Sequence, residues 1–252
     1  MFRPRVIPVL LIKGNGLVKT VGFKSPKYIG DPINAIRIFN ELESDEIIFL
    51  DITASADGRT IPTDLVKNIG DEAFMPFAVG GGIRELDQAR EIISAGAEKV
   101  VINTSFSKNY KLVSEIAKVY GCQSVTVSID TKKNIFGKYK VYTHGGMKST
   151  SLGPVEHAIN AENQGAGEIF INSISKDGIT TGYDYDIIAA VSDAVTIPVI
   201  ACGGAGHYDH FKMAINSGAS AVAAGSMFVY HGPRAAVLIN YPDRNELVKL
   251  FN

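Results

Sequence analysis

Residues 76–82 read PFAVGGG, and residues 198–204 repeat that pattern as PVIACGG. Shorter motifs share the same spacing of 122 positions (168 − 46 in the first pair): Glu46 with Glu168, Gly96 with Gly218, and Thr104 with Ser226. A constant long offset between short motifs is typical of an internal duplication. We therefore predict one domain over residues 1–252, made of two half-domains at roughly 1–122 and 123–252.

Short apolar, β-branched runs alternate with stretches of helical periodicity along the whole chain. The expected strands lie near 5–12, 46–51, 75–79, 98–103, 124–130, 168–172, 197–201 and 220–224. Helical spacing of apolar residues appears between them, as in 85–95 and 109–120. Strands that alternate with helices pair in parallel, and strands that are apolar at both parities are buried on both faces. With a duplicated four-strand unit, we predict an α/β fold, a single (β/α)8 TIM barrel; an open doubly wound sheet is the alternative.

The composition excludes some classes of protein. The net charge is −1, so no broad attraction to nucleic acid or to an anionic membrane is expected. The N-terminus leads directly into a strand-like run, and no apolar run approaches the roughly 20 residues of a membrane-spanning helix. We expect a soluble, cytoplasmic protein with a large core.

Cysteines and histidines show no metal-ligand spacing. Cys122 and Cys202 are far apart and outside any CxxC pattern, so we expect two buried, reduced thiols. His207 and His210 are three residues apart with no third ligand visible, which favours surface residues. His144 could touch a substrate from a long connection. The sequence predicts neither a metal nor a cofactor.

Glycines and hydroxyl residues follow four of the expected strands in a repeated pattern. Glycine lets a phosphate oxygen approach the backbone, and a hydroxyl with N–H groups at a helix start completes an anion site. Because the pattern occurs twice, we predict two phosphate sites and a long ligand with a phosphate at each end. The alternative is that the glycines only form tight turns. The residues concerned are Gly81, Gly82, Asn103, Thr104, Gly203, Gly204, Gly225 and Ser226.

The two halves differ in one potentially catalytic residue. Asp130 ends the strand near 124–130, at the barrel face where active sites lie, and is placed for general acid or base catalysis. At the matching position of the first half the chain has Leu11, which carries no ionisable proton. Asp51, and Asp177 with Gly178, also follow strands and are candidates for substrate binding. For Asp51, a loop-capping role is an equal alternative.

Two further features mark the opposite ends of the predicted barrel. Arg5, Glu46, Lys99 and Glu168 each begin a strand, so at the barrel floor they could form a ring of ion pairs, or else a solvated rim. Connections 13–31 and 131–152 follow strands 1 and 5 and are long, as expected for loops or lids over an active site.

Together these motifs resemble the cyclase subunit of imidazole glycerol phosphate synthase along essentially the whole chain. The resemblance implies a substrate with two phosphates and a glutaminase partner docked on the barrel floor. It also implies that ammonia passes from the partner through the four charged floor residues, which act as a gate. Lys19 falls on the family's functional lysine, and Asp130 falls on one of its two catalytic aspartates. The matching stretches are 45–46, 49–55, 79–83, 99–104, 129–130, 165–168, 177–178, 182–184 and 203–206.

The departures from this family bear on function. Leu11 falls on the other, first catalytic aspartate of the family, Asn172 stands where Thr is usual, and Cys202 where Ser is usual. This combination resembles a divergent branch found with surface-polysaccharide genes, whose members supply ammonia together with a glutaminase and a sugar amidotransferase that builds acetamidino groups.

Three functional interpretations remain open at this point. The chain could be such an ammonia-conducting barrel, a histidine-pathway cyclase that works through Asp130 alone, or a non-catalytic scaffold that activates a glutaminase. A related isomerase barrel also uses two aspartates to bind a bisphosphate substrate. An isomerase of that kind would not need the charged residues at the barrel floor, so this interpretation ranks below the other three.

Overall fold

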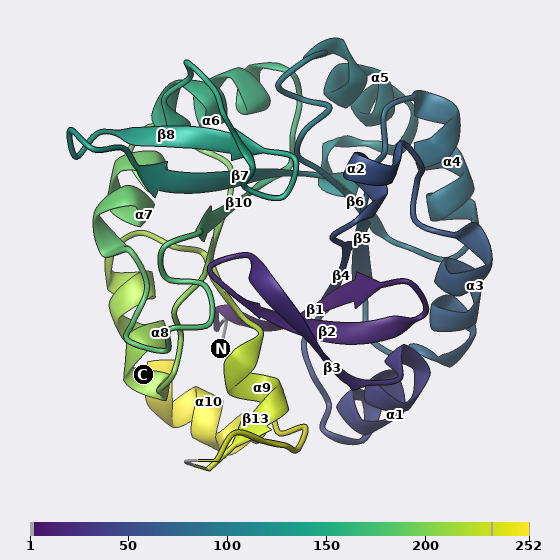
Figure 1. Ribbon diagram of the computed structural model, residues 1–252, viewed down its shortest axis with the longest axis vertical. Coiled ribbons are helices and arrows are strands. Elements are labelled where there is room, and N and C mark those ends of the chain that lie inside the picture. Colours follow the sequence, from purple (N-terminus) through teal and green to yellow (C-terminus); the bar gives the residue numbers. More distant parts are fainter. Residues whose placement is uncertain (1–2, 233, 252) are drawn as a thin grey trace.

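Eight parallel strands form a closed barrel in the computed structural model, which describes residues 3–232 and 234–251 (Figure 1). Each strand pairs in parallel with the next, and the last closes on the first in the register Arg5↔Ala221 to Pro8↔Ala224. The predicted (β/α)8 TIM barrel is confirmed. The barrel strands are β1 (Arg5–Lys13), β4 (Ile47–Asp51), β5 (Phe77–Gly80), β6 (Lys99–Ile102), β7 (Val125–Lys133), β10 (Glu168–Ser173), β11 (Val199–Cys202) and β12 (Ala221–Ala224).

Helices surround the barrel on its outside (Figure 1). The first begins where Asp31 accepts a hydrogen bond from the Asn34 backbone N–H at 2.9 Å, with Pro32 in the first turn. The long helices are α1 (Pro32–Glu41), α3 (Thr63–Glu72), α4 (Leu86–Ser94), α5 (Lys111–Tyr120), α6 (Pro154–Asn163), α7 (Tyr185–Ser192), α8 (Tyr208–Asn216) and α10 (Arg244–Phe251). Short elements are α2 (Ala54–Asp57), η1 (Cys122–Ser124), α9 (Ser226–Val229), β13 (Tyr230–His231) and β14 (Ala236–Val237). No helix in the described part of the chain is long and apolar enough to cross a membrane.

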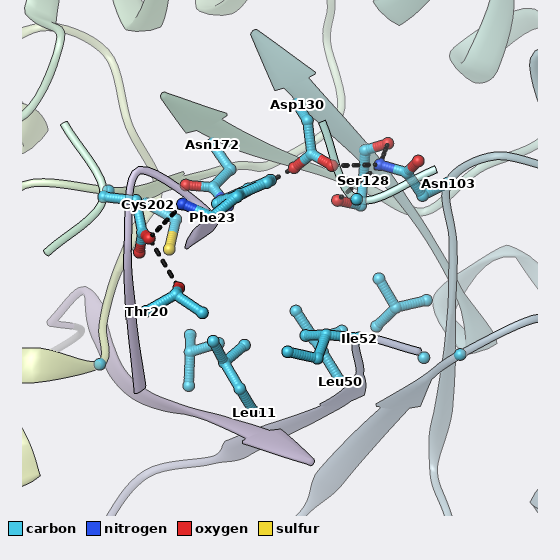
Figure 2. A pocket seen from close by; sticks show the side chains of 18 of the residues that line it. Leu11, Thr20, Phe23, Leu50, Ile52, Asn103, Ser128, Asp130, Asn172 and Cys202 are labelled. Carbon is cyan, nitrogen blue, oxygen red and sulfur yellow. Dashed lines mark hydrogen bonds between the residues drawn. The ribbon is translucent and has the colours of Figure 1, made fainter. Parts of the chain in front are cut away.

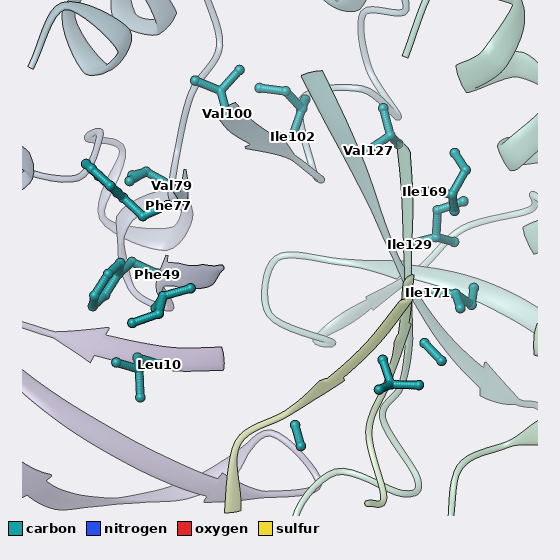
Figure 3. Packing of buried hydrophobic residues seen from close by; sticks show 14 of the residues in the cluster. Leu10, Phe49, Phe77, Val79, Val100, Ile102, Val127, Ile129, Ile169 and Ile171 are labelled. Carbon is teal, nitrogen blue, oxygen red and sulfur yellow. The ribbon is translucent and has the colours of Figure 1, made fainter. Parts of the chain in front are cut away.

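The core has two layers because successive strand residues point to opposite faces. On β1, Leu10 and Ile12 pack outward against the helices, whereas Ile7, Val9 and Leu11 belong to a smaller cluster inside the barrel. Figure 3 shows the outward set on the other strands, including Phe49, Phe77, Val100 and Ile129. Burial of both faces explains why the strands are apolar at both parities.

The two long connections, expected from sequence as loops or lids, are β-hairpins. β1 and β7 continue beyond the barrel and fold back, the first into β2 (Gly16–Val21) and β3 (Lys24–Gly30), the second into β8 (Tyr139–Thr143) and β9 (Lys148–Ser149). Gly14 and Gly137 supply the positive φ angles of 61° and 75° that such tight turns need.

The cysteines differ in their surroundings. Cys122 is exposed in η1, the turn between α5 and β7, so the prediction of a buried thiol is wrong there. Turns at the end of a barrel face water whatever residue they carry. Cys202 is half-buried at the end of β11. The division into half-barrels at residues 122 and 123 falls within η1 and stays a prediction.

Candidate active site

A pocket opens at the C-terminal ends of the barrel strands, the face on which barrel enzymes bind their substrates (Figure 2). It brings together residues from both halves of the chain. Except for His144, the catalytic and substrate-binding candidates from the sequence all line it: Lys19, Asp51, Gly81, Gly82, Asn103, Thr104, Asp130, Asn172, Asp177, Gly178, Gly203, Gly204, Gly225 and Ser226. Leu11 lines the same pocket.

The glycine pairs at the ends of β5 and β11 are required by close backbone packing. A β-carbon on Gly82 would lie 1.9 Å from the Arg59 carbonyl oxygen, and one on Gly204 would lie 2.2 Å from the Gly182 carbonyl oxygen. Both glycines also have positive φ angles, 69° and 114°. These glycines therefore form tight turns, which was the alternative interpretation from sequence. They also leave backbone without side chains facing the pocket.

Asp130 is a buried carboxyl group whose proton affinity is changed by its surroundings. Burial raises the pKa of Asp130 to about 7, although hydrogen bonds from Asn103 and Asn172 partly offset this rise. The Asn103 Nδ2 atom lies 3.0 Å from Oδ2, and the Asn172 Nδ2 atom lies 3.5 Å from Oδ1. A carboxyl group with a pKa near neutrality can both accept and release a proton at physiological pH.

Leu11 occupies the same place in the first half that Asp130 occupies in the second. Leu11 is in register with Leu50 on the neighbouring strand, and Asp130 is in register with Asn172. Figure 2 shows Leu11 and Leu50 across the pocket from Asp130 and Asn172. The pair Leu11 and Leu50 at the pocket mouth is therefore apolar, whereas the matching pair Asp130 and Asn172 is polar.

Lys19 is a buried cation at the edge of the pocket. It lies on β2 and is 5% exposed, and no carboxylate of the described residues lies within ion-pair distance of it. A β-carbon on Gly225 would lie 2.4 Å from its Nζ atom, so the ammonium group adjoins the end of β12. Lys19 thus lies beside Gly225 and Ser226, one of the predicted phosphate-binding pairs.

Asp177 links the first hairpin to the second half of the barrel. Its Oδ2 atom accepts hydrogen bonds from the Thr20 hydroxyl at 2.8 Å and the Phe23 backbone N–H at 3.1 Å. Its backbone carbonyl accepts a third from the Gly22 N–H at 2.9 Å. The carboxylate therefore holds the hairpin that carries Lys19.

Asp51 takes the loop-capping position that was the alternative for it. Its carboxylate accepts hydrogen bonds from the backbone N–H groups of Thr53 and Ala54, at 2.9 and 3.0 Å. It also pairs with the Arg59 guanidinium at 2.6 Å, and its side chain is fully buried. Its carboxylate is engaged in holding the loop after β4.

The four charged residues at the other end of the barrel form a closed ring of ion pairs. Arg5 contacts both Glu46 and Glu168, and the Lys99 Nζ atom lies 2.9 Å from each of the same two carboxylates. Glu46 directly precedes β4 and the other three begin their strands. The ring interpretation of the sequence is thus confirmed as geometry, because each acid contacts both bases.

Comparison with known proteins agrees with this geometry. A family model described as "Histidine biosynthesis protein" matches residues 5–233. The chain belongs to this family.

Several relatives resemble the chain over nine-tenths of its length or more. The "Putative imidazole glycerol phosphate synthase subunit hisF2" of Pseudomonas aeruginosa is 49% identical over 248 residues, 98% of this chain and 99% of that protein. The "Putative imidazole glycerol phosphate synthase subunit HisF" of Leptospira interrogans is 44% identical over 253 residues, all of both chains. The "Imidazole glycerol phosphate synthase subunit HisF" of Thermococcus onnurineus is 46% identical over 231 residues, 91% of each. The resemblance to the cyclase subunit of imidazole glycerol phosphate synthase is confirmed.

Asn172 and Cys202, the two smaller departures that the sequence resemblance implies, are neighbours in the pocket. Asn172 and Cys202 are in register on β10 and β11. Burial raises the pKa of the Cys202 thiol to about 12, so the thiol is neutral. The structure thus groups Asp130, Asn172 and Cys202 on three successive strands of the barrel mouth.

Sequence reasoning missed several residues of the site. Ser128 lines the pocket two residues before Asp130 on the same face of β7, and strand alternation alone could have indicated it. Phe23 also lines the pocket, and Arg59 pairs with Asp51. Their positions depend on turns and long-range contacts, for which the sequence carries no periodic signal.

The histidines lie outside the pocket lining or at its edge. The His144 backbone N–H donates to the Thr104 hydroxyl at 3.0 Å, so His144 joins the tip of the second hairpin to the end of β6. His207 caps α8 and its side chain is 67% exposed. Among residues 3–232 and 234–251, no group of three or more His, Cys, Asp or Glu residues could hold a metal ion.

Proposed function

We propose that this chain is a divergent cyclase-type barrel that conducts ammonia from a partner glutaminase in the cytoplasm. In this proposal the glutaminase docks at the floor, and the ring of Arg5, Glu46, Lys99 and Glu168 gates ammonia entry. The ammonia serves a separate amidotransferase that builds acetamidino groups on surface-polysaccharide sugars. The pocket at the mouth binds a ligand with two phosphates, and Asp130 and Lys19 act on it or hold it.

The observation that carries this proposal is Leu11 opposite Asp130 in an otherwise complete pocket. A reaction that needs one group to protonate and another to deprotonate the substrate loses one of them when the first is a leucine. The floor ring, in contrast, has all four members in contact. Two relatives carry the numbered names hisF2 and hisF3, which fits a family with more than one version of this subunit.

A second candidate function is the histidine-pathway cyclase reaction itself. It is favoured by Asp130, because a pKa of about 7 allows one carboxyl group to act in turn as acid and base. In that case the chain would make imidazole glycerol phosphate and its aminoimidazole carboxamide co-product from the phosphoribulosyl bisphosphate substrate.

A cyclase assay with ammonium and the phosphoribulosyl substrate separates the two candidates. We expect Leu11→Asp to raise the rate of imidazole glycerol phosphate formation at least about tenfold, or about 1.4 kcal/mol of barrier. Leu11→Asn is the matched control, because asparagine has the same shape as aspartate but no ionisable proton. If the unmodified chain already turns over about as fast as a family member with both aspartates, the second candidate is correct and the first is wrong.

Coupling to the glutaminase tests the gate. With glutamine as nitrogen source, Lys99→Met should change the yield of transferred ammonia per glutamine hydrolysed, while added ammonium should bypass the defect. Unchanged coupling would contradict the gate. If Asp130→Asn has no effect on any reaction and the glutaminase is still activated, the chain acts as a scaffold.

A further inference from the structure

The walls of the pocket mouth differ in polarity, and the difference follows the strands. We define the polar wall as Asn103, Ser128, Asp130 and Asn172, from the residue after β6, from β7 and from β10. We define the apolar wall as Leu11, Leu50 and Ile52, from β1, β4 and the residue after β4. Figure 2 shows the two walls facing each other across the open space.

Polar groups of the polar wall are linked to one another but keep free hydrogen-bonding capacity toward the pocket. Asn103 donates to Asp130 and to the Ser128 backbone carbonyl, at 3.0 and 3.1 Å. The Ser128 Oγ atom lies 3.5 Å from the same Asn103 Nδ2 atom. A carboxylate has about four acceptor sites, so Asp130 can still accept from a ligand after two amide contacts.

The apolar wall has no such capacity, because its surroundings are apolar too. Leu11 pairs with Leu50 on one side and with Val18 of β2 on the other. Behind it the cluster continues into the barrel through Val9 and Ile48. A ligand hydroxyl or amine pressed against this wall would lose its water and find no partner, which weakens binding.

We propose that the pocket selects a bisphosphate whose central part carries hydrogen-bonding groups along one edge only, and that Leu11 is the main residue that sets this selection. This inference rests on the two phosphate sites of the proposed function. The ligand class is a bisphosphate that lacks hydroxyl and amino groups on the edge facing Leu11 and Leu50. A bisphosphate hydroxylated along both edges, such as an open-chain sugar bisphosphate, is discriminated against at this wall.

Calorimetric titration with matched probe ligands tests the inference on the full chain. One series consists of straight-chain diol bisphosphates of increasing length, and the other of alditol bisphosphates with the same number of carbons. The measured quantity is the ratio of the two dissociation constants at the best chain length. Leu11→Asn should shift this ratio about tenfold or more in favour of the alditol, because the amide offers a partner without adding charge.

Control variants determine whether polarity is responsible. Leu11→Met keeps the wall apolar and should leave the ratio unchanged, whereas Asn172→Leu on the polar wall should shift it toward the diol. If Leu11→Asn does not fold, Leu50→Asn at the half-buried position beside it should give the same direction of change. An equal ratio in the unmodified chain and in both Asn variants overturns the selection by this wall. Failure of every bisphosphate to bind at any length overturns the two phosphate sites, and with them this inference.

Discussion

At the scale of single residues, two buried ionisable groups have pKa values displaced in opposite senses by the same cause. Asp130 is 8% exposed and His157, on α6, is 1% exposed. Burial disfavours the charged form of each, which raises the pKa of the acid and lowers the pKa of the base. Each group therefore makes stability depend on pH, with opposite sign.

Asp130 should make the native state less stable as pH rises from 4 toward 7. Its pKa is about 7 when folded and 3.8 when unfolded, so between those values only the folded chain holds the proton. Raising the pH removes that advantage, by roughly 2–3 kcal/mol between pH 5 and 8. We expect Asp130→Asn to abolish this decline, and chemical denaturation of both proteins across that range measures it. An identical pH dependence in the two proteins would contradict a buried acid here.

His157 should have the reverse effect, with stability lost as pH falls below 6.5. Burial lowers the pKa of His157 to about 4. The centroid of its ring lies 4.8 Å from that of Phe106, and its Nδ1 atom has no hydrogen-bond partner among the described residues. The unfolded chain then binds a proton that the folded chain does not, at a cost of about 2 kcal/mol by pH 5. His157→Phe should remove this loss. Unfolding curves at pH 8 and pH 5 for both proteins provide the comparison, and an equal loss in His157→Phe would assign it to other groups.

At the scale of elements, the two hairpins extend from opposite strands of the barrel and are held by different parts of it. The first, β2 and β3, is bonded to Asp177 in the loop after β10. The second, β8 and β9, is bonded through His144 to Thr104 after β6, and the Tyr139 hydroxyl donates to Asp184 at 2.6 Å. Each hairpin thus depends on contacts far away in sequence, and the first positions Lys19.

Removal of the Asp177 carboxylate should loosen the first hairpin without unfolding the barrel. Asp177→Ala leaves the Thr20 hydroxyl and the Phe23 N–H without their acceptor, so we expect amide hydrogens near residues 19–24 to exchange about 10–100 times faster. Asp184→Ala is the matched control, and it should raise exchange around β8 instead. Equal protection of residues 19–24 in both variants would show that Asp177 does not hold this hairpin.

At the scale of the whole molecule, the floor ring connects strands that are distant along the chain. Its members lie at the starts of β1, β6 and β10 and directly before β4, and both acids are nearly buried, with side chains 3% and 10% exposed. Buried acids are tolerated only while their cations remain in place. The ring is therefore a structural requirement of the barrel floor in addition to its proposed role as a gate.

Loss of one cation from the ring should destabilise the whole barrel. Lys99→Met leaves Glu46 and Glu168 with Arg5 alone, and we expect the free energy of unfolding to fall by roughly 2–4 kcal/mol. The double variant Lys99→Met with Glu46→Gln should recover part of this loss, because one carboxylate is removed as well. Arg37→Met, which breaks an exposed pair with Glu72, should change the stability little. Urea unfolding of the four proteins is the measurement, and a Lys99→Met protein as stable as the parent would exclude a required ring.

Much of the fold and the site could be predicted from sequence because the signals are local and repeated. Apolar runs of strand length, separated by helical spacing, predict the parallel barrel, and barrel topology places every strand end at one mouth. For that reason Asp130 and the glycine pairs could be assigned to a single pocket although they are far apart in the chain, whereas Lys19 was assigned from the family resemblance. The charged residues that begin strands predict the ring for the same reason.

The sequence by itself determined the barrel, the two ends that carry charge and chemistry, and the difference between Leu11 and Asp130, since all of these follow from pattern and offset. Only the tertiary structure decided that the long connections are hairpins, that Asp51 is engaged with Arg59, that Asp177 holds the first hairpin and that Cys122 is exposed. It also decided that Asp130 titrates near neutral pH. These properties arise from partners brought together over long distances and from the exclusion of water, and neither is recorded in the order of residues along the chain.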